Sequence, residues 1–301
     1  MYAITGASGN IGSKTADILL DKGEKVRVIG RSASRLQRFV ERGAEAAVGD
    51  LKDGDFVTSA FTGVTAVFAM IPPDYTAVDF LAYQNQVGAN LAIAIKNSGI
   101  RYVVSLSSQG ANLAEGTGPI LGLCIQEERL NRLEGVNILH LRPTYFMENL
   151  LMNIHLINRM GFAGSAVRGD QKFAMIATRD IAAHLAERLV KRDFEGKKVQ
   201  DLLGQRDLSL DEAVTVIGRE INRPDLKYLQ FSYDEAAKGL TEMGISADVS
   251  RLFVEMSKAL NEGLFAVNRV RTPENTTPTS IEEFAYTFAL LFSESTLRRA
   301  A

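Results

Sequence analysis

The stretch Tyr2-Ala3-Ile4-Thr5-Gly6-Ala7-Ser8-Gly9-Asn10-Ile11-Gly12 decides the fold of this chain. A short apolar strand runs directly into a GxxGxxG motif, and a helical pattern begins within it. Glycines at this spacing permit a tight strand-to-helix turn, let backbone N–H groups approach a pyrophosphate, and allow the helix to pack closely on the strand. The motif therefore predicts a dinucleotide site made by Gly6, Ser8, Gly9, Asn10, Ile11 and Gly12. The alternative is a turn of the same shape that binds no ligand.

The sequence around this motif alternates between strand-like and helical patterns. Six β-branched or apolar runs are separated by helical segments, among them 78–97 and 125–133. Runs such as VTAVFAMI (64–71) are apolar on both faces, as strands covered by helices on each side must be. Right-handed crossovers then give an α/β fold of the Rossmann type, with a doubly wound parallel sheet. The expected strands are YAIT (2–5), KVRVIG (25–30), AEAAVGD (44–50), VTAVFAMI (64–71), RYVVSLSS (101–108) and VNILHLRP (136–143).

The regular alternation weakens after Pro143, and the rest of the chain reads as mostly helical. We expect a dinucleotide-binding domain over 1–150 and a smaller, mostly helical domain over 151–301, with a segment at about 173–204 returning to the first domain. The expected helices are NLLMNIHLINRM (149–160), TRDIAAHLAERLV (178–190), SLDEAVTVIGREI (209–221), one after Tyr233, one at 249–261 and SIEEFAYTFALLF (280–292), with strand-like KVQDLLG (198–204) and LKYLQF (226–231). Two further segments, GFAGSAVRGD (161–170) and VRTPENTTPT (270–279), read as loops, and the second should be exposed.

Composition narrows the class of partner. The 301 residues carry 34 Lys and Arg against 36 Asp and Glu, a net charge of -2, so no global field favours nucleic acid. A small molecule is the expected partner, and the oligomeric state stays open. Cys124 is the single cysteine, which suits a reducing compartment, and no export signal or membrane span is visible. We therefore expect a cytoplasmic protein.

The choice of dinucleotide depends on the end of the second strand. An NAD-selective fold usually places Asp or Glu there to bind the ribose hydroxyls, but this strand ends at Gly30 and continues into Arg31 and Ser32. A guanidinium and a hydroxyl suit a 2′-phosphate, so NADP(H) is expected in preference to NAD(H). Ser32 as a helix cap beside a solvated Arg31 is the alternative.

The ends of the third and fourth strands supply the remaining candidate contacts. Asp50 and Leu51 follow the third strand, where an adenine can rest, or they form a simple turn. The turn Met70-Ile71-Pro72 ends the fourth strand, and it either lines the nicotinamide ribose or merely terminates the strand.

Several of these segments together resemble the NmrA-like family of atypical short-chain dehydrogenase/reductases, over most of the chain. The segments that carry the resemblance are GASGNIG (6–12), the Gly-Arg-Ser after the second strand, GDLKD (49–53), VVSLSS (103–108) followed by Gly-Ala, LRPTYFMEN (141–149) and TRDIAAHLAE (178–187). The resemblance implies NADP(H) on a Rossmann domain, a small helical second domain, and the Tyr145 segment near the nicotinamide.

The wider superfamily uses a Tyr-x-x-x-Lys pair as its proton donor, and this chain lacks it. None of the eight tyrosines has Lys four residues later, and the equivalent positions hold Ile120 and Cys124. Because carbonyl reduction generally needs that acid, quinone or azo acceptors that collect their proton from water are favoured. The resemblance to NmrA-like quinone and azo reductases agrees, while a nucleotide-sensing regulator is the rival hypothesis.

Few polar side chains remain as candidates near the nicotinamide. Ser107 and Tyr145 are candidate cofactor contacts and, with His155, weak candidates for catalysis; no catalytic residue is assigned. Phe146 and Asn149 are expected to form the wall for the acceptor, with packing between the domains as the alternative. His140 and His184 lack partners at metal spacing, so no metal is expected.

Overall fold

A parallel sheet of seven strands forms the centre of the first lobe, and the structure, a computed structural model, describes residues 1–265 and 270–300. The strands of this sheet are β1 (Tyr2–Ile4), β2 (Val26–Gly30), β3 (Glu45–Val48), β4 (Ala66–Ala69), β5 (Tyr102–Leu106), β6 (Asn137–Pro143) and β10 (Lys197–Leu202). Their order is β10-β6-β5-β4-β1-β2-β3 and all pairings are parallel, which confirms the expected Rossmann-type sheet. The strand-like segment 198–204 supplies the seventh strand.

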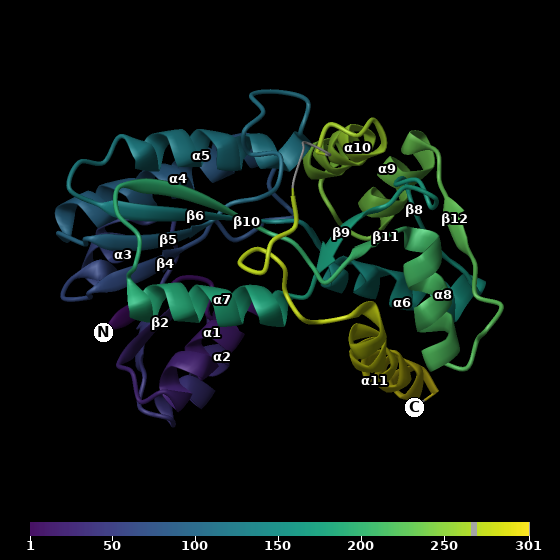
Figure 1. Ribbon diagram of the computed structural model, residues 1–301, viewed down its shortest axis with the longest axis horizontal. Helices are drawn as coiled ribbons and strands as arrows, with labels where there is room; N and C mark the ends of the chain where they lie inside the picture. Colours follow the sequence, from purple (N-terminus) through teal and green to yellow (C-terminus); the bar gives the residue numbers. More distant parts are fainter. Residues whose placement is uncertain (266–269, 301) are drawn as a thin grey trace.

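Helices cover both faces of this sheet (Figure 1). One face is covered by α1 (Asn10–Asp21), α2 (Ala33–Val40) and α7 (Thr178–Lys191), and the other by α3 (Gly54–Phe61), α4 (Phe80–Asn97) and α5 (Leu121–Asn131). The 3-10 turn η1 (Gly118–Ile120) leads into α5. The sheet is therefore the middle layer of three, which explains strands that are apolar on both sides.

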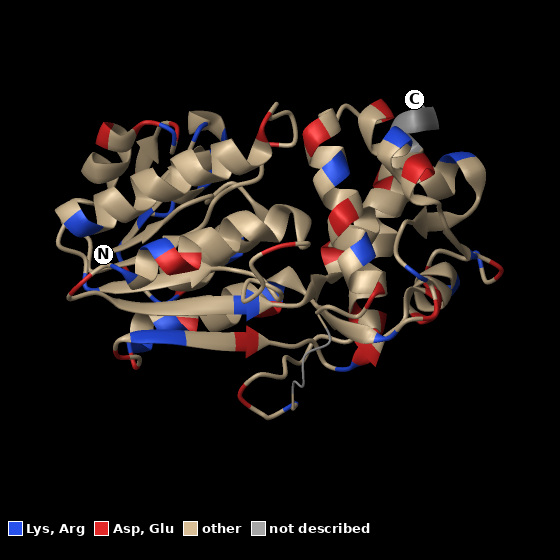
Figure 2. Ribbon diagram, turned by 90° about the horizontal axis from the view of Figure 1, so that it is seen from above, with Lys and Arg blue, Asp and Glu red and all other residues tan. Residues whose placement is uncertain are grey.

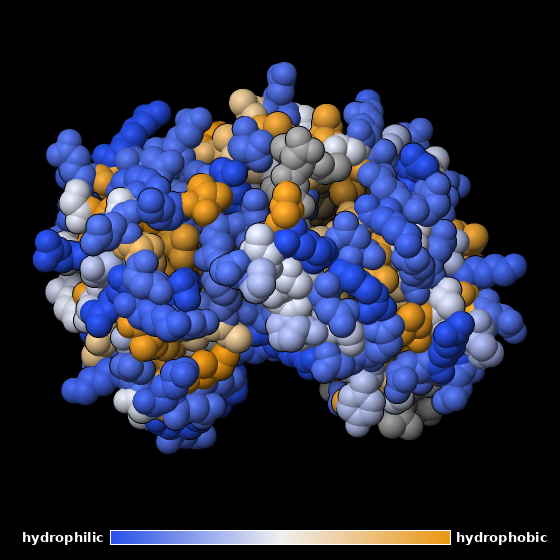
Figure 3. All heavy atoms as spheres, in the orientation of Figure 1, coloured by the Kyte–Doolittle hydropathy of each residue, from blue (hydrophilic) through white to orange (hydrophobic). Residues whose placement is uncertain are grey.

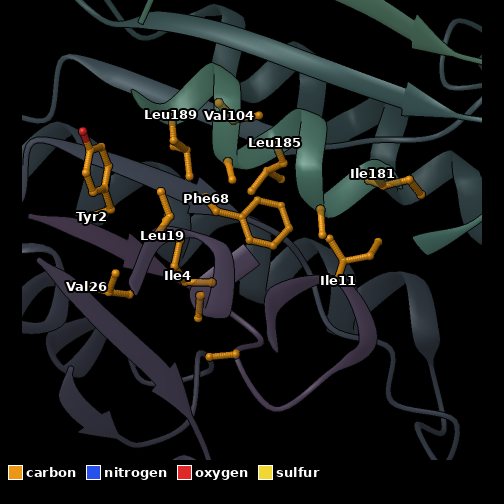
Figure 4. Packing of buried hydrophobic residues seen from close by; sticks show 14 of the residues in the cluster. Tyr2, Ile4, Ile11, Leu19, Val26, Phe68, Val104, Ile181, Leu185 and Leu189 are labelled. Atoms are coloured by element: carbon orange, nitrogen blue, oxygen red, sulfur yellow. The ribbon is translucent and has the colours of Figure 1, made fainter. Parts of the chain in front are cut away.

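The core between the sheet and α1 and α7 is closely packed and largely closed to water. Figure 4 shows Leu19 of α1 and Leu185 of α7 lying over Ile4 of β1 and Phe68 of β4, and all four side chains are 0% exposed. Burial of each such side chain stabilises the fold by about 1.5–3 kcal/mol. This packing holds α1, and with it the glycine motif, at a fixed place on the sheet.

The second lobe combines short strands with helices around a separate apolar core. Its elements are β7 (Tyr145–Phe146), η2 (Met147–Met152), α6 (Asn153–Met160), β8 (Ala163–Ser165), β9 (Phe173–Ile176), β11 (Asp207–Leu208), α8 (Leu210–Glu220), β12 (Tyr228–Gln230), α9 (Tyr233–Glu242), α10 (Ala247–Asn261) and α11 (Ile281–Ala300). Strands β11, β9 and β7 form one small sheet and β12 and β8 another. The C-terminal region is mostly helical, as expected.

Local hydrogen bonds set several helix starts that the sequence pattern misplaced. Helix α4 begins at Phe80, not at 78, because the Asp79 carboxylate caps the N–H of Ala82. Helix α5 begins at Leu121, four residues before the expected start, because η1 leads directly into it. The expected helix 149–160 is a 3-10 turn up to Met152, and the expected loop 161–170 contains β8, which pairs with the distant β12.

The linker 270–279 is a loop with exposed residues at 270, 272–274 and 278, as its Pro, Thr and Asn content indicated, but two of its threonines are buried. Thr277 and Thr279 are only 7% and 3% exposed. Thr277 bonds to the carbonyl of Leu203 at the end of β10, and the buried carboxylate of Asp180 accepts from both the N–H and the hydroxyl of Thr279. Polar residues can be buried where each finds a partner, so the linker fastens α11 to α7.

The carboxyl ends of the central strands point toward the second lobe (Figure 1). Figure 3 shows a broad notch between the two lobes on the side of α2 and α11. In Figure 2 acidic and basic residues are interspersed over both lobes. None of the described helices is long and apolar enough to cross a membrane.

Candidate functional site

The glycine motif forms a close turn at the carboxyl end of β1. Gly6 has φ +62°, and its carbonyl accepts the N–H of Gly9 at 2.9 Å. A Cβ at Gly12 would lie 2.4 Å from the oxygen of Gly6, so this approach of backbone to backbone requires glycine. Ser8, Gly9 and Asn10 are exposed at the start of α1, and no side chain caps it. The unpaired N–H groups of that turn suit a pyrophosphate.

Ile11 is the one member of the motif that turns away from this surface. Its side chain is 6% exposed and packs in the core beneath α1. Any contact of Ile11 with a dinucleotide would therefore come from its backbone.

Arg31 and Ser32 lie at the carboxyl end of β2, where the ribose of the adenosine half is expected. Arg31 is exposed, and its guanidinium forms no ion pair with the residues that the structure describes. Ser32 occupies the N-cap position of α2, yet its hydroxyl bonds to Ser34 Oγ at 3.0 Å and not to a helix N–H. The exposed cation and two hydroxyls at a helix start fit a 2′-phosphate.

The two residues expected as ligand contacts in the loop after β3 differ in their exposure. Asp50 is partly exposed and accepts the N–H of Lys52 at 2.9 Å, whereas the Leu51 side chain is 7% exposed and packs in the core with Val57 and Leu91. Only Asp50 can therefore present its side chain to a ligand.

The turn after β4 borders the glycine motif. The N–H of Met70 bonds to Thr5 Oγ1 at 2.9 Å, and the sulfur of Met70 lies 2.7 Å from where a Cβ on Gly6 would stand. The Pro72 carbonyl accepts the hydroxyl of Tyr83 at 2.7 Å, and burial raises the pKa of that phenol to about 12. Met70, Ile71 and Pro72 thus form a fixed, mainly apolar wall next to the glycines.

Ser107 takes part in a buried hydrogen-bonded network that sequence reasoning missed. Its hydroxyl donates to the carboxylate of Glu127 on α5, and Arg142 of β6 donates to the same carboxylate from Nε at 2.9 Å and from Nη2 at 2.5 Å. Ser107 is 4% and Glu127 5% exposed. The Glu127 carboxylate holds the pKa of Arg142 above its usual range. Because its proton is committed to a carboxylate, Ser107 can accept a hydrogen bond here but is not a ready proton donor.

The positions equivalent to the missing Tyr and Lys hold apolar groups. Ile120 packs with Ala111, Ala259 and Phe265, so a contact between the lobes replaces the tyrosine. Cys124 is 8% exposed, and burial is the main cause that raises the pKa of its thiol. Ile120 has no acidic proton, and burial makes the Cys124 thiol a weaker acid than an exposed one.

Tyr145 belongs to the core of the second lobe. It pairs with Met175 in the β7–β9 ladder, and its ring centroid is 5.2 Å from that of Phe173. Burial raises the pKa of the Tyr145 phenol. Phe146 turns the other way and packs against the core of the first lobe. These two aromatic residues join the lobes, so Phe146 makes the packing contact between the domains that is the alternative to a wall for the acceptor.

Asn149 and His155 are exposed on η2 and α6, and the structure does not bring His155 together with Ser107. His140 is fully buried, and its Nε2 lies 3.0 Å from Asn131 Oδ1. His184 pairs with Gln200. Among the described residues no three His, Cys, Asp or Glu side chains form a group that could hold a metal ion.

Hydrogen bonds to Glu148, in the LRPTYFMEN segment, fix the start of α7. The Glu148 carboxylate accepts the N–H of Thr178 at 3.0 Å, and Lys14 of α1 donates to the Thr178 hydroxyl at 3.0 Å. The carboxylate satisfies an N–H at the helix start and thereby links η2 to both helices under the sheet.

Fold and site together define a dinucleotide-binding α/β protein whose glycine turn, apolar wall and exposed cation line the carboxyl edge of one sheet. The model of the NmrA-like family matches residues 2–285, and the chain belongs to this family. The family is NAD(P)H-binding and contains oxidoreductases. The expectation drawn from the motifs is thereby confirmed.

Known relatives cover nearly the whole chain. An NAD(P)H azoreductase of Xenophilus azovorans is 27% identical over 85% of this chain and 86% of its own length. The structure of an NADPH-dependent quinone oxidoreductase from Escherichia coli, 22% identical, superposes with a TM-score of 0.77 over 97% of this chain and all (100%) of that one. The structure of a negative transcriptional regulator, NmrA, in complex with NADP is 15% identical with a TM-score of 0.75, and covers 98% of this chain and 97% of that one.

Proposed function

We propose that this protein reduces a small planar acceptor, a quinone or an azo compound, with NADPH. The observation that carries the proposal is the combination of a complete glycine turn with apolar groups at the two positions that would hold a Tyr–Lys proton donor. An acceptor that gains its proton from water does not need that donor.

The balance of the reaction is simple. NADPH supplies a hydride, and one proton from water completes the reduction of a quinone to a hydroquinone or of an azo bond to a hydrazo bond. The chain binds the pyrophosphate at the start of α1, where the backbone N–H groups of Asn10 and Ile11 have no side-chain cap. Met70 and Ile71 keep water from one side of the site. The hydroxyl of Ser107 donates its proton to Glu127 and can accept a hydrogen bond from the bound cofactor. Catalysis then consists mainly of alignment.

NADP(H) is proposed in preference to NAD(H) because Arg31 and the hydroxyls of Ser32 and Ser34 face solvent at the end of β2, where no carboxylate stands. The proposed cofactor contacts are Gly6, Ser8, Gly9, Asn10, Ile11, Gly12, Arg31, Ser32, Asp50, Met70, Ile71, Pro72 and Ser107. We further propose a dinucleotide domain at 1–144 to which 178–202 returns, and a second domain from the rest of the chain; the expected bounds of 1–150 and 173–204 are too wide, because β7, η2 and β9 pack in the second lobe.

The test is NADPH oxidation with a panel of quinones and azo dyes, together with single replacements Ser107→Ala, Tyr145→Phe and His155→Gln. Turnover should fall by far less than the roughly 10²–10⁴-fold that loss of a general acid causes. Collapse of kcat in Tyr145→Phe with unchanged NADPH affinity would assign the acid to Tyr145.

A regulator that senses the nucleotide is the second candidate, and the fold similarity to the NADP-bound regulator supports it. The same panel separates the two. Tight NADPH binding without turnover of any acceptor would favour the regulator.

A further inference from the structure

Helix α10 lies between the two lobes (Figure 1), and its two ends are bound to different lobes. At its last residue, the Asn261 side chain accepts the N–H of Arg168 at 2.8 Å and donates to the carbonyl of Ala166 at 2.9 Å, in the segment after β8 of the second lobe. At its start, Ser246 and Asp248 are bound to the loop between β4 and α4 of the first lobe. The start of α10 thus contacts the lobe that contains the dinucleotide site.

Three hydrogen bonds attach the start of α10 to this loop. The N–H of Ser246 donates to the Tyr75 carbonyl at 2.9 Å, and its hydroxyl donates to the Ala77 carbonyl at 2.7 Å. The Asp248 carboxylate accepts the N–H of Phe80, the first residue of α4, at 2.9 Å, and this bond is the main cause that holds the pKa of the Asp248 carboxyl below its usual range. An N–H at a helix start has no partner within its own helix, so a charged group of the second lobe satisfies a helix of the first.

Apolar packing supports the same attachment. Phe80 packs with Val249 and Leu252 of α10, and the three residues are 4%, 0% and 2% exposed. Tyr83, one turn later in α4, packs against this cluster, and its ring centroid is 6.0 Å from that of Phe80. Helix α10 therefore holds the first turn of α4 and, with it, the side chain of Tyr83.

Tyr83 connects α4 to the wall formed by residues 70–72 beside the glycine turn. Its hydroxyl donates to the Pro72 carbonyl at 2.7 Å. At the other end of this wall, the sulfur of Met70 lies 2.7 Å from where a Cβ on Gly6 would stand. A continuous series of contacts therefore runs from the carboxylate on α10 to the turn at which the pyrophosphate is proposed to bind.

We propose that Asp248 is a positioning residue of the dinucleotide site, and that it acts through Phe80 and Tyr83 on the wall at 70–72. The inference rests on the dinucleotide binding of the proposed function and deepens it, because it gives the second lobe a part in cofactor affinity. Loss of the Asp248 carboxylate frees the start of α4 and hence the Pro72 carbonyl. Affinity then falls, because a wall that is no longer preorganised must be ordered when the dinucleotide binds.

Glu255 on the same helix offers a matched control. It pairs with Arg251 at 3.6 Å, as Asp248 does at 2.8 Å, and it accepts the N–H of Gly118 in η1 at 3.3 Å. Removal of either carboxylate therefore takes from α10 one charge and one hydrogen bond to the first lobe. The bond of Glu255 leads to η1, whereas the bond of Asp248 leads to α4 and the wall.

The experiment is calorimetric titration of NADP⁺ into the native protein, Asp248→Ala, Asp248→Asn and Glu255→Ala. Asp248→Ala should raise Kd by about threefold to tenfold, the value of one net hydrogen bond. Asp248→Asn keeps a carbonyl oxygen that can accept the N–H of Phe80, so it should retain most of the native affinity, as should Glu255→Ala. A native Kd in Asp248→Ala, or an equal loss in Glu255→Ala, would overturn the proposal.

Tyr83→Phe tests the other end of the same series of contacts, because it removes only the bond to Pro72. Kd should rise by a similar factor, and the double variant with Asp248→Ala should bind about as well as the weaker single variant, since both changes act on the same wall. Losses that multiply in the double variant would contradict the proposal. A native Kd in Tyr83→Phe would overturn it as well, and this variant decides the matter where Asp248→Ala does not fold.

The titration also separates failure of this proposal from failure of the proposed function. It uses NADP⁺ without an acceptor, so the result does not depend on turnover of quinones or azo compounds. Native binding of NADP⁺ that Asp248→Ala and Tyr83→Phe both retain would overturn only the role of Asp248. A native protein that binds neither NADP⁺ nor NADPH would overturn the proposed function, and the role of Asp248 with it.

Discussion

The glycines of the turn after β1 have different tasks, because a side chain at each would meet different neighbours. A Cβ on Gly12 would lie 2.4 Å from Gly6 O and 2.8 Å from Gly6 C, and backbone cannot move aside easily. A Cβ on Gly9 would lie 3.3 Å from the oxygen of Gly6 and otherwise face solvent, and Gly9 has the extended φ of -96° that any residue can adopt. Gly12 thus serves packing, while Gly9 leaves room for a ligand.

This difference predicts opposite results for two variants. Gly9→Val should keep the native free energy of unfolding but lower dinucleotide affinity by about tenfold to a hundredfold or more, because the side chain fills the approach to the pyrophosphate. Gly12→Ala should destabilise the fold by about 1–3 kcal/mol. Calorimetric titration and urea unfolding measure the two effects. Native NADPH affinity in Gly9→Val would mean that the turn has only a structural role.

Arg31 tests the choice of dinucleotide. Arg31→Ala should weaken NADPH by about tenfold to a hundredfold, the value of one charge-assisted hydrogen bond of about 1.5–3 kcal/mol, and should leave NADH almost unchanged. Arg219→Ala, an exposed arginine on α8, is the matched control. The measurement is the ratio of the two dissociation constants, and a native protein that binds both nucleotides equally would contradict the expectation.

The pairing of β5, β6 and α5 depends on the Glu127 network. Glu127→Gln leaves the Arg142 guanidinium, whose side chain is 15% exposed, without its carboxylate, and we expect a loss of about 3–5 kcal/mol of stability. The next residue supplies the control, because the side chain of Glu128 is 64% exposed and Glu128→Gln should change stability by less than about 1 kcal/mol. Urea unfolding at pH 7 compares them. Equal stability of the two variants would mean that the buried pair contributes little.

Helices, strands and turns that are determined by their own residues could be predicted from the sequence. The strand-to-helix turn at the glycines, the strands that are apolar on both sides and the helix α7 were all expected correctly, because each is marked by its own residues. Errors arose where distant partners decide the outcome. The segment 161–170 contains a strand only because β12 lies beside it, and Thr279 is buried only because Asp180 accepts its hydrogen bonds.

The residues of the candidate site also separate into those that a local sequence signal predicts and those whose role depends on distant partners. Ser8, Asn10 and Arg31 are exposed at the carboxyl ends of β1 and β2, as expected for residues that directly follow strands, whereas Ile11 is buried. The role of Ser107 was not predictable, since Glu127 is 20 residues away and Arg142 lies on another strand. The expectation that Tyr145 lies near the nicotinamide stays a prediction, and its place in the β7–β9 ladder depends on a pairing that no local pattern indicates.

Two histidines should contribute to the response of the whole molecule to acid, because burial lowers the pKa of both His140 and His184, and the larger shift belongs to His140. Burial is the main cause that lowers the pKa of His140 from 6.5 to about 4, with Glu127 opposing it and Arg142 and Lys197 adding to it. Between these values the unfolded chain binds a proton that the folded chain does not. Stability should therefore fall as pH drops from 6.5 to 4, by roughly 3 kcal/mol from His140.

The measurement compares urea unfolding at pH 7 and pH 4.5. His140→Gln should lose less stability over this interval than the native protein, and His155→Gln, at an exposed position of α6, should behave as the native protein does. Carboxylates add to the acid loss of all three proteins, so the differences between them carry the result. Equal losses in all three would remove His140 as a cause.

The return of α7 and β10 to the first lobe governs how the chain can fold while it is being made. Leu185 and Leu189 of α7 cover Leu19 and Phe68, which are synthesised more than a hundred residues earlier. Until α7 emerges from the ribosome, the apolar face of α1 has no cover and β6 has an open edge. We therefore expect the nascent first lobe to expose apolar surface throughout the synthesis of β7, α6 and β9. A stalled or truncated chain that ends before Leu202 is expected to aggregate or be degraded, even though it contains the whole glycine turn.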